Sequence, residues 1–267
     1  MGDLVTDVRR PCAVSVLGGP TTVLDLGGQR IVVDPTFDPP GPHAYLTKTA
    51  APAVDAAALG PVDVVLVSHD QHLDNFDDAG RAMALSAPLV LTNPGAAQRL
   101  GAPARGLAPW ETVELDGLRV QAVPAVHGPA DGERDDSGHV NCEVTGFVLS
   151  GDGVPTVYVS GDNASLAAVA KIANGVGAID VAVLFVGAAR VPPKQGGRPL
   201  TLTSARAAAA AEVLAPRVVI AAHLDSWAHF TEGLDDVATA FYDAGIADLL
   251  DQTPHGSWVD LEPFVAT

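Results

Sequence analysis

A run of side chains that commonly bind metals occupies residues 68–75, which read SHDQHLDN. Two imidazoles and two carboxylates fall between His69 and Asp74. Imidazole and carboxylate groups without thiolate suit a zinc-like cation that keeps open coordination positions, as in catalytic sites. The run therefore indicates metal-dependent chemistry.

The surrounding sequence places this run at a strand-to-helix corner. Residues 62–67 form an apolar run typical of a buried β-strand, and residues 76–85 can form a helix. Four further apolar strands are each followed by a polar residue, namely Asp34, His127, Asp162 and His223. Because ligands of layered α/β folds bind beyond the carboxyl ends of strands, we expect these side chains to build one site.

Length and composition narrow the class of protein. With 267 residues and 48% hydrophobic content, the chain can bury the core of one large domain. A formal charge of −17 argues against a nucleic-acid partner, which would need clustered Lys and Arg. The longest apolar stretch, residues 181–189, is far shorter than the roughly 20 residues of a membrane span. We expect a small-molecule substrate and neither nucleic acid nor membrane as a partner.

The two cysteines and the first residues bear on location. Cys12 and Cys142 are too few for a disulfide framework, and they lack CxxC spacing. Residues 1–7 do not resemble a secretory signal. These features favour a reducing cytoplasm. Cys142 is expected to be a small apolar filler, because nothing near it in the sequence would lower its pKa.

The order of predicted elements suggests one domain, residues 1–267, with two similar halves of roughly 1–140 and 141–267. Each half begins with hairpins and continues with strand–helix alternation. The proline-rich residues 35–61 are expected to be an irregular excursion that shapes a cleft. Such a chain can fold as two sheets packed face to face, with helices on both outer faces.

The ordered set of polar residues resembles the metallo-β-lactamase superfamily, whose signature is an HxHxDH run followed by three single ligands. The resemblance covers about residues 14–230, and residues 125–129 and 222–230 resemble the branch of ascorbate-phosphate-lactonase-like hydrolases. It implies an α/β fold, specifically an αββα four-layer sandwich. Related lactonase-like proteins form oligomers, so the resemblance is also compatible with a homo-oligomer.

The signature run departs from the family pattern. His69 and His72 are three residues apart instead of two, and Asn75 stands where the family has its last histidine. One interpretation, which we favour, is a single inserted residue that leaves Asp74 in its usual place after the second histidine. In the gapless alternative, Gln71 replaces that histidine and Asp74 stands at the position of the last one. One expected imidazole is missing in both cases.

The resemblance implies a role for each ligand. His69, His72 and His127 would surround one ion, Asp74 and His223 a second, and Asp162 would bridge them. The implied cofactor is Zn²⁺, as one or two ions, with Mn²⁺ or Fe²⁺ as alternatives. Asn75 could offer only a carbonyl ligand, so we expect the second site to be weaker.

The predicted function is that of a metal-dependent hydrolase from the lactonase-like branch of the superfamily. A metal-activated hydroxide would attack a small-molecule lactone, amide or phosphoester. Asp74 or Asp70 would accept or orient the proton of the water, and His229 would contact the substrate. Asp34 is expected to orient a neighbouring group. The alternatives are a metal-depleted, non-catalytic binding protein of the same fold and, less favoured, an iron-dependent redox relative.

Overall fold

Two seven-stranded sheets form the frame of the molecule in the computed structural model, which describes residues 3–129, 141–192 and 194–265. The first sheet has the order β16 (Val259–Asp260), β1 (Cys12–Gly18), β2 (Thr21–Leu26), β3 (Gln29–Val33), β6 (Val64–Val67), β7 (Leu89–Thr92) and β8 (Ala104–Gly106). The second has the order β15 (Leu250–Asp251), β14 (Val218–Ala222), β13 (Val181–Phe185), β12 (Val154–Val159), β11 (Thr145–Gly151), β10 (Leu118–Pro124) and β9 (Thr112–Leu115). In each sheet a parallel set of strands continues an antiparallel set.

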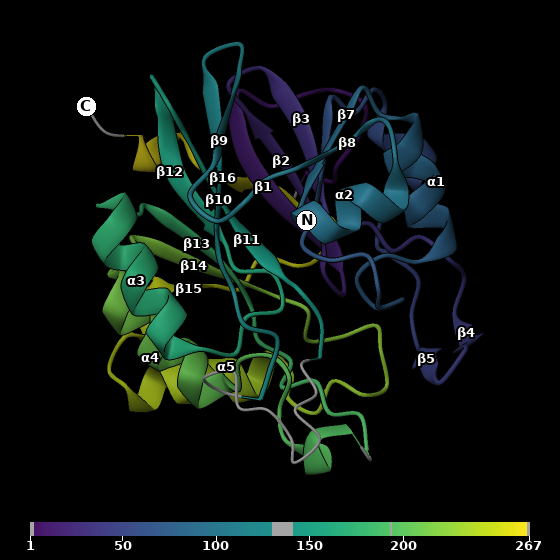
Figure 1. Cartoon of the computed structure of the whole chain (residues 1–267). Helices are drawn as coiled ribbons and strands as arrows, with labels where there is room; N and C mark the ends of the chain where they lie inside the picture. Colours follow the sequence, from purple (N-terminus) through teal and green to yellow (C-terminus); the bar gives the residue numbers. More distant parts are fainter. Residues whose placement is uncertain (1–2, 130–140, 193, 266–267) are drawn as a thin grey trace.

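Helices cover the outer faces of both sheets (Figure 1). The first sheet carries α1 (Asp78–Ser86) and α2 (Pro94–Leu100), and the second carries α3 (Leu166–Val176), α4 (Ser204–Leu214) and α5 (Leu234–Asp243). Short 3-10 helices span Ala56–Leu59, Lys194–Gly197, Ala247–Leu249 and Glu262–Phe264. The four-layer αββα sandwich expected from the sequence is confirmed. No helix within the described ranges is long and apolar enough to cross a bilayer.

The core follows from the period-two alternation of the strands. In β14, Val218, Ile220 and Ala222 pack between the two sheets, whereas Val219 and Ala221 pack beneath the helices of the second sheet. Successive side chains of a strand point to opposite faces, so a strand that is apolar on both faces must be buried on both. The core between the sheets fixes where the strands end, and therefore where the loops that follow them meet.

The structure adds three details to the elements expected from the sequence. The chain passes to the second sheet at β9, well before residue 140, and it returns to the first sheet at β16. Residues 35–61 contain a small hairpin, β4 (Gly41–His43) with β5 (Leu46–Lys48), besides irregular chain. The helix α1 begins at Asp78 instead of residue 76, because Phe76 is buried in the core and Asp77 accepts the N-cap hydrogen bond from the Gly80 backbone.

Candidate metal centre

The predicted ligands come together where five strands from both sheets end. Strands β3 and β6 of the first sheet deliver Asp34 and residues 68–75, and β10, β12 and β14 of the second deliver His127, Asp162 and His223. The six predicted ligands fall into two neighbouring groups. One contains His69, His72 and His127, and the other contains Asp74, Asp162 and His223.

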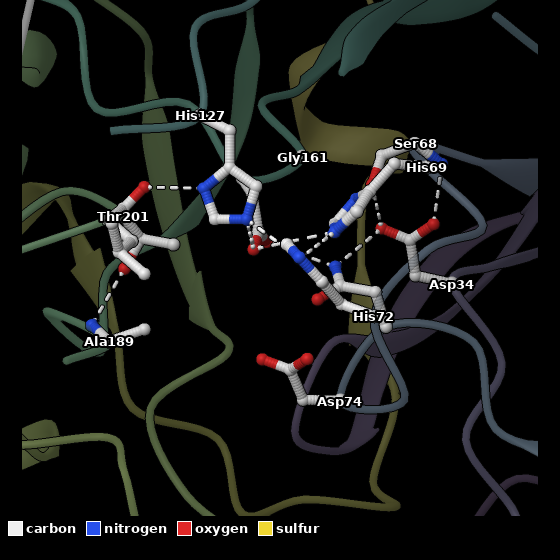
Figure 2. A network of polar contacts seen from close by, with 12 residues as sticks. Asp34, Ser68, His69, His72, Asp74, His127, Gly161, Ala189 and Thr201 are labelled. Atoms are coloured by element: carbon white, nitrogen blue, oxygen red, sulfur yellow. Dashed lines mark hydrogen bonds and ion pairs between the residues drawn. The ribbon is translucent and has the colours of Figure 1, made fainter. Parts of the chain in front are cut away.

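Three imidazoles converge in the first group. Figure 2 shows His72 between His69 and His127. The His72 Nδ1 atom lies 3.0 Å from His69 Nε2 and 3.1 Å from His127 Nε2. Zinc holds imidazole nitrogens at about 2.0 Å, which places two tetrahedral ligands about 3.3 Å apart. The spacing of these nitrogens therefore fits a shared cation.

In His69 and His127, the hydrogen bond made by Nδ1 shows which ring nitrogen carries the proton. Ser68 Oγ donates to Asp34 Oδ2 at 2.7 Å, so it accepts from His69 Nδ1 at 3.0 Å. His127 Nδ1 lies 3.0 Å from the backbone carbonyl of Leu200, to which it can only donate. Both Nε2 atoms are then unprotonated in the neutral ring and direct their lone pairs at the centre, as ligands require.

Burial keeps these rings neutral. It is the largest cause that lowers the pKa of His69 and of His127 well below the ordinary value, and neighbouring imidazoles add to it. Burial likewise lowers the pKa of His72, and it lowers that of His223 to about 3. Because imidazole binds a cation only in its unprotonated form, the site is prepared for metal at neutral pH.

Asp162 lies between the two groups. Its Oδ2 atom is 3.3 Å from His127 Nε2, and its Oδ1 atom is 3.3 Å from His223 Nε2. Oδ2 is buried and has no hydrogen-bond partner among the described residues. Burial, and then the charge of Asp74, raises the pKa of Asp162 well above its usual range. A buried carboxylate oxygen without a partner is costly unless a cation compensates it, which fits the bridging position.

Asn75 lies among Asp34, Asp162 and His223. Its Nδ2 atom donates to Asp34 Oδ2 at 3.2 Å and to Asp162 Oδ1 at 3.0 Å. Its Oδ1 atom thereby faces His223 Nε2 at 3.1 Å. The carboxamide is thus held by two carboxylates and presents one oxygen to the second group.

Asp74 and His229 form a close pair at the second group. His229 Nε2 lies 2.8 Å from Asp74 Oδ2, whereas His223 Nε2 lies 3.7 Å from the same oxygen. Burial alone would raise the pKa of Asp74, but the hydrogen bond from His229 and nearby imidazoles bring it below its usual range. His229 is therefore a partner of Asp74 as well as a residue that lines the site.

Asp34 and Asp70 serve different neighbours. Asp34 accepts from the Ser68 backbone N–H at 2.6 Å and from the Ser68 hydroxyl, and it orients His69 through that hydroxyl, in line with the orienting role expected of it. Burial raises its pKa to about 7. Asp70 instead binds the Arg99 guanidinium through both oxygens, at 2.6 and 2.9 Å, and belongs to neither group. The contact with the attacking water stays a prediction for Asp70.

Cys142 is the functional candidate that the sequence analysis missed. Far from being an isolated apolar filler, it presents its sulfur within 4.8 Å of a ligand nitrogen from each of the three imidazoles in the first group. Burial is the main reason that the pKa of its thiol is raised. Its position in the sequence, 15 residues after His127 in a polar stretch, carries no recognisable metal-binding spacing. Only the fold brings it here.

Two hollows adjoin the centre. A hollow of about 10 Å³, room for about one water, is lined by residues that include Tyr45, Asp74, Lys194 and His229. A larger cavity of about 380 Å³ lies beside His127 and Cys142. Lys48 is buried in an ion pair with Asp77, with 3.0 Å between Nζ and Oδ2. His139 and most of the predicted loop at 128–138 lie outside the described residues.

Comparison with known proteins finds relatives that are described as metal-dependent hydrolases and solved structures of the same fold. Residues 29–224 match the family model described as the β-lactamase superfamily domain. A UPF0173 metal-dependent hydrolase from Methanosphaerula palustris is 31% identical over 219 residues, which are 81% of this chain and 86% of that protein. The structure of a "possible metal-dependent hydrolase" from Veillonella parvula has a TM-score of 0.82 at 18% identity and covers 94% of this chain and all of that one. An isothiocyanate hydrolase from Delia radicum gut bacteria has a TM-score of 0.79 at 20% identity, over 93% and 99% of the two chains.

Proposed function

The chain belongs to the β-lactamase superfamily and, within it, to the UPF0173 metal-dependent hydrolases, and from this membership and the site we propose that it hydrolyses a small molecule, with lactone opening as the leading reaction. The observation that carries the proposal is the convergence of three neutral imidazoles on one point beside a second group of two carboxylates and an imidazole. This donor set suits Zn²⁺, in one or two positions.

The chemistry divides between the cation and the protein. A bound divalent cation lowers the pKa of water from about 15.7 toward 7 and polarises the bond to be broken. Asp74 lines the small hollow, where its carboxylate can accept or orient a proton. His229 holds the other face of that carboxylate. Asp34 and Ser68 keep His69 in the orientation that ligation needs.

Charge at the site supports a substrate of low negative charge. Lys194 carries the single formal positive charge among the described residues that line the hollow beside Asp74. A highly phosphorylated substrate would need several cationic side chains. A lactone needs none, and the similarity of residues 222–230 to lactonase-like relatives ranks it ahead of amides and phosphoesters.

The test begins with protein purified without chelators. We expect at least one zinc-type ion per chain by elemental analysis, and turnover of one member of a panel of lactones, amides and phosphoesters. His127→Ala and Asp162→Ala should each lower kcat/KM by more than a hundredfold, since losing even a ligand's partner costs roughly 10- to 100-fold. Circular dichroism should show that both variants keep the fold.

Matched controls are available outside the site. His255 lies against Asp225 instead of the metal centre, and Asp152 is exposed in the turn before Gly153. His255→Ala and Asp152→Ala should leave both metal content and turnover unchanged. Metal content far below one ion per chain would favour the metal-depleted binding protein instead. Full activity in both site variants would contradict the assignment.

A further inference from the structure

We propose that Cys142 supplies its thiolate as a fourth ligand to the cation held by His69, His72 and His127. The inference rests on the proposed function only in that it needs a cation at this group. The sulfur lies within 4.8 Å of a nitrogen from each of the three rings. Zinc binds sulfur at about 2.3 Å and nitrogen at about 2.0 Å, which places tetrahedral neighbours about 3.5 Å apart. The upper limit of 4.8 Å is compatible with a shared cation.

The backbone on the C-terminal side of Cys142 is fixed against the strand that carries His69. Thr145 N–H donates to the Ser68 carbonyl at 3.0 Å. Asn93 Nδ2 donates to the carbonyls of both Ser68 and Glu143, at 3.2 and 3.1 Å. Residues 143–145 are therefore tied to the residue that precedes His69, and Cys142 approaches the imidazoles as a consequence of this packing.

A second observation also points to a ligand at this place. Asp162 Oδ2 is buried without a hydrogen-bond partner among the described residues, and it is directed at the same group, 3.3 Å from His127 Nε2 and 3.9 Å from His69 Nε2. Sulfur and this oxygen together would surround the cation that the three imidazoles hold. Both are negatively charged when bound, so they offset a divalent charge in a buried setting.

A thiolate ligand has two consequences for the site. Soft thiolate favours zinc over manganese or magnesium, so it decides the identity of the first cation. The first cation would also be surrounded by three imidazoles, the thiolate and Asp162 Oδ2, which would leave it no open position. The open coordination position then belongs to the group of Asp74, Asp162 and His223, next to the hollow that Asp74 lines.

Cobalt(II) is the probe that tests this ligand directly. Chelator-treated protein is loaded with Co²⁺, and the absorption spectrum is recorded. We expect visible d–d bands from bound cobalt together with a near-ultraviolet thiolate-to-cobalt charge-transfer band. Cys142→Ser should retain the d–d bands, lose the charge-transfer band and bind zinc roughly 10- to 100-fold more weakly. Cys12→Ser is the matched control, because Cys12 is buried in the core between the sheets.

Alkylation of the unmutated protein gives a second readout that needs no variant. Cys142 lines the cavity of about 380 Å³ beside His127, from which a small maleimide can reach it. Zinc should slow modification of Cys142 by more than tenfold, as followed by peptide mass spectrometry, because a metal-bound thiolate is a poor nucleophile.

The outcomes separate the two proposals. Bound cobalt and substrate turnover without a charge-transfer band, or without zinc protection, would overturn the thiolate ligand and leave the hydrolase intact. A charge-transfer band that survives in Cys142→Ser would also overturn it. Absence of any cobalt binding would overturn the hydrolase and the ligand together.

Discussion

Asn75 is the residue that bears most directly on the second group of donors. Its amide nitrogen is engaged by Asp34 and Asp162, so its oxygen faces His223. An amide oxygen is a neutral and weak ligand for zinc compared with an imidazole nitrogen. The second group therefore contains two carboxylates and one imidazole as its strong donors.

Restoring the imidazole should strengthen the second cation site. In Asn75→His, we expect the second zinc ion to bind about tenfold more tightly, an effect on the scale known for changes around metal ligands. Stepwise titration against a chromophoric chelator measures it. Asn174→His, on the exposed face of α3, is the matched control and should change neither step. Weaker or unchanged binding of the second ion in Asn75→His would show that the position does not belong to the site.

At the scale of the elements, the turn after β12 decides where Asp162 lies. Gly161 has a φ of +55°, in the left-handed region. A Cβ atom there would lie 2.8 Å from Ser68 Cβ and 2.9 Å from the Thr145 carbonyl oxygen. The close approach allows strand ends from the two sheets to meet beside the metal centre (Figure 2). Glycine is required both for its φ and for the space.

A comparison of Gly161→Ala with Gly153→Ala separates the cost of the positive φ from the cost of the close contact. Gly153 also has a positive φ, +71°, but an added Cβ there meets nothing within 4 Å. Gly153→Ala should lower the free energy of unfolding by about 1–2 kcal/mol, the cost of the left-handed conformation alone. Gly161→Ala should cost about 2 kcal/mol more through overpacking, and it should also weaken zinc binding. Urea unfolding of the zinc-loaded and zinc-free proteins measures both effects; equal losses in the two variants would contradict the close contact.

At the scale of the whole molecule, the centre joins the two sheets. His69, His72 and Asp74 follow a strand of the first sheet, whereas His127, Asp162 and His223 follow strands of the second. A cation that binds both sets cross-links the sandwich at the edge where its strands end. Metal binding is then linked to global stability, because the unfolded chain cannot assemble the site.

Chelation should therefore lower the melting temperature of the whole protein. Free zinc at a hundred times its Kd stabilises the folded state by about 2.7 kcal/mol, which corresponds to a shift of roughly 5–10 °C for a chain of this size. Differential scanning calorimetry with and without a chelator measures the shift. His127→Ala should melt near the temperature of the chelated protein and respond little to added zinc. An equal zinc response in this variant would show that the cation binds elsewhere.

Much of the fold was determined by local sequence. Apolar runs that end in a polar residue predicted β3, β6, β10, β12 and β14. They also predicted the edge of the sheets at which the ligands gather, because an apolar run indicates a buried strand and the polar residue marks its carboxyl end. Asn93 directly before Pro94 is a local pattern typical of a helix start, and in α2 the Asn93 side chain accepts the N-cap hydrogen bond from the Ala96 N–H. The inserted residue between His69 and His72 was also the favoured alignment, and the structure brings both rings to one point.

Only the tertiary structure decided the contacts that depend on distant segments. The approach of Cys142 to the imidazoles requires residues 143–145 to pack on Ser68, and nothing in its local sequence specifies that packing. The ion pair of Asp70 likewise depends on a distant segment, because α2 places Arg99 against it. The sequence by itself determined which donors exist and at which strand ends they stand. The grouping of these donors into one centre depended on how the two sheets pack. That packing results from many weak apolar contacts, which no single motif encodes.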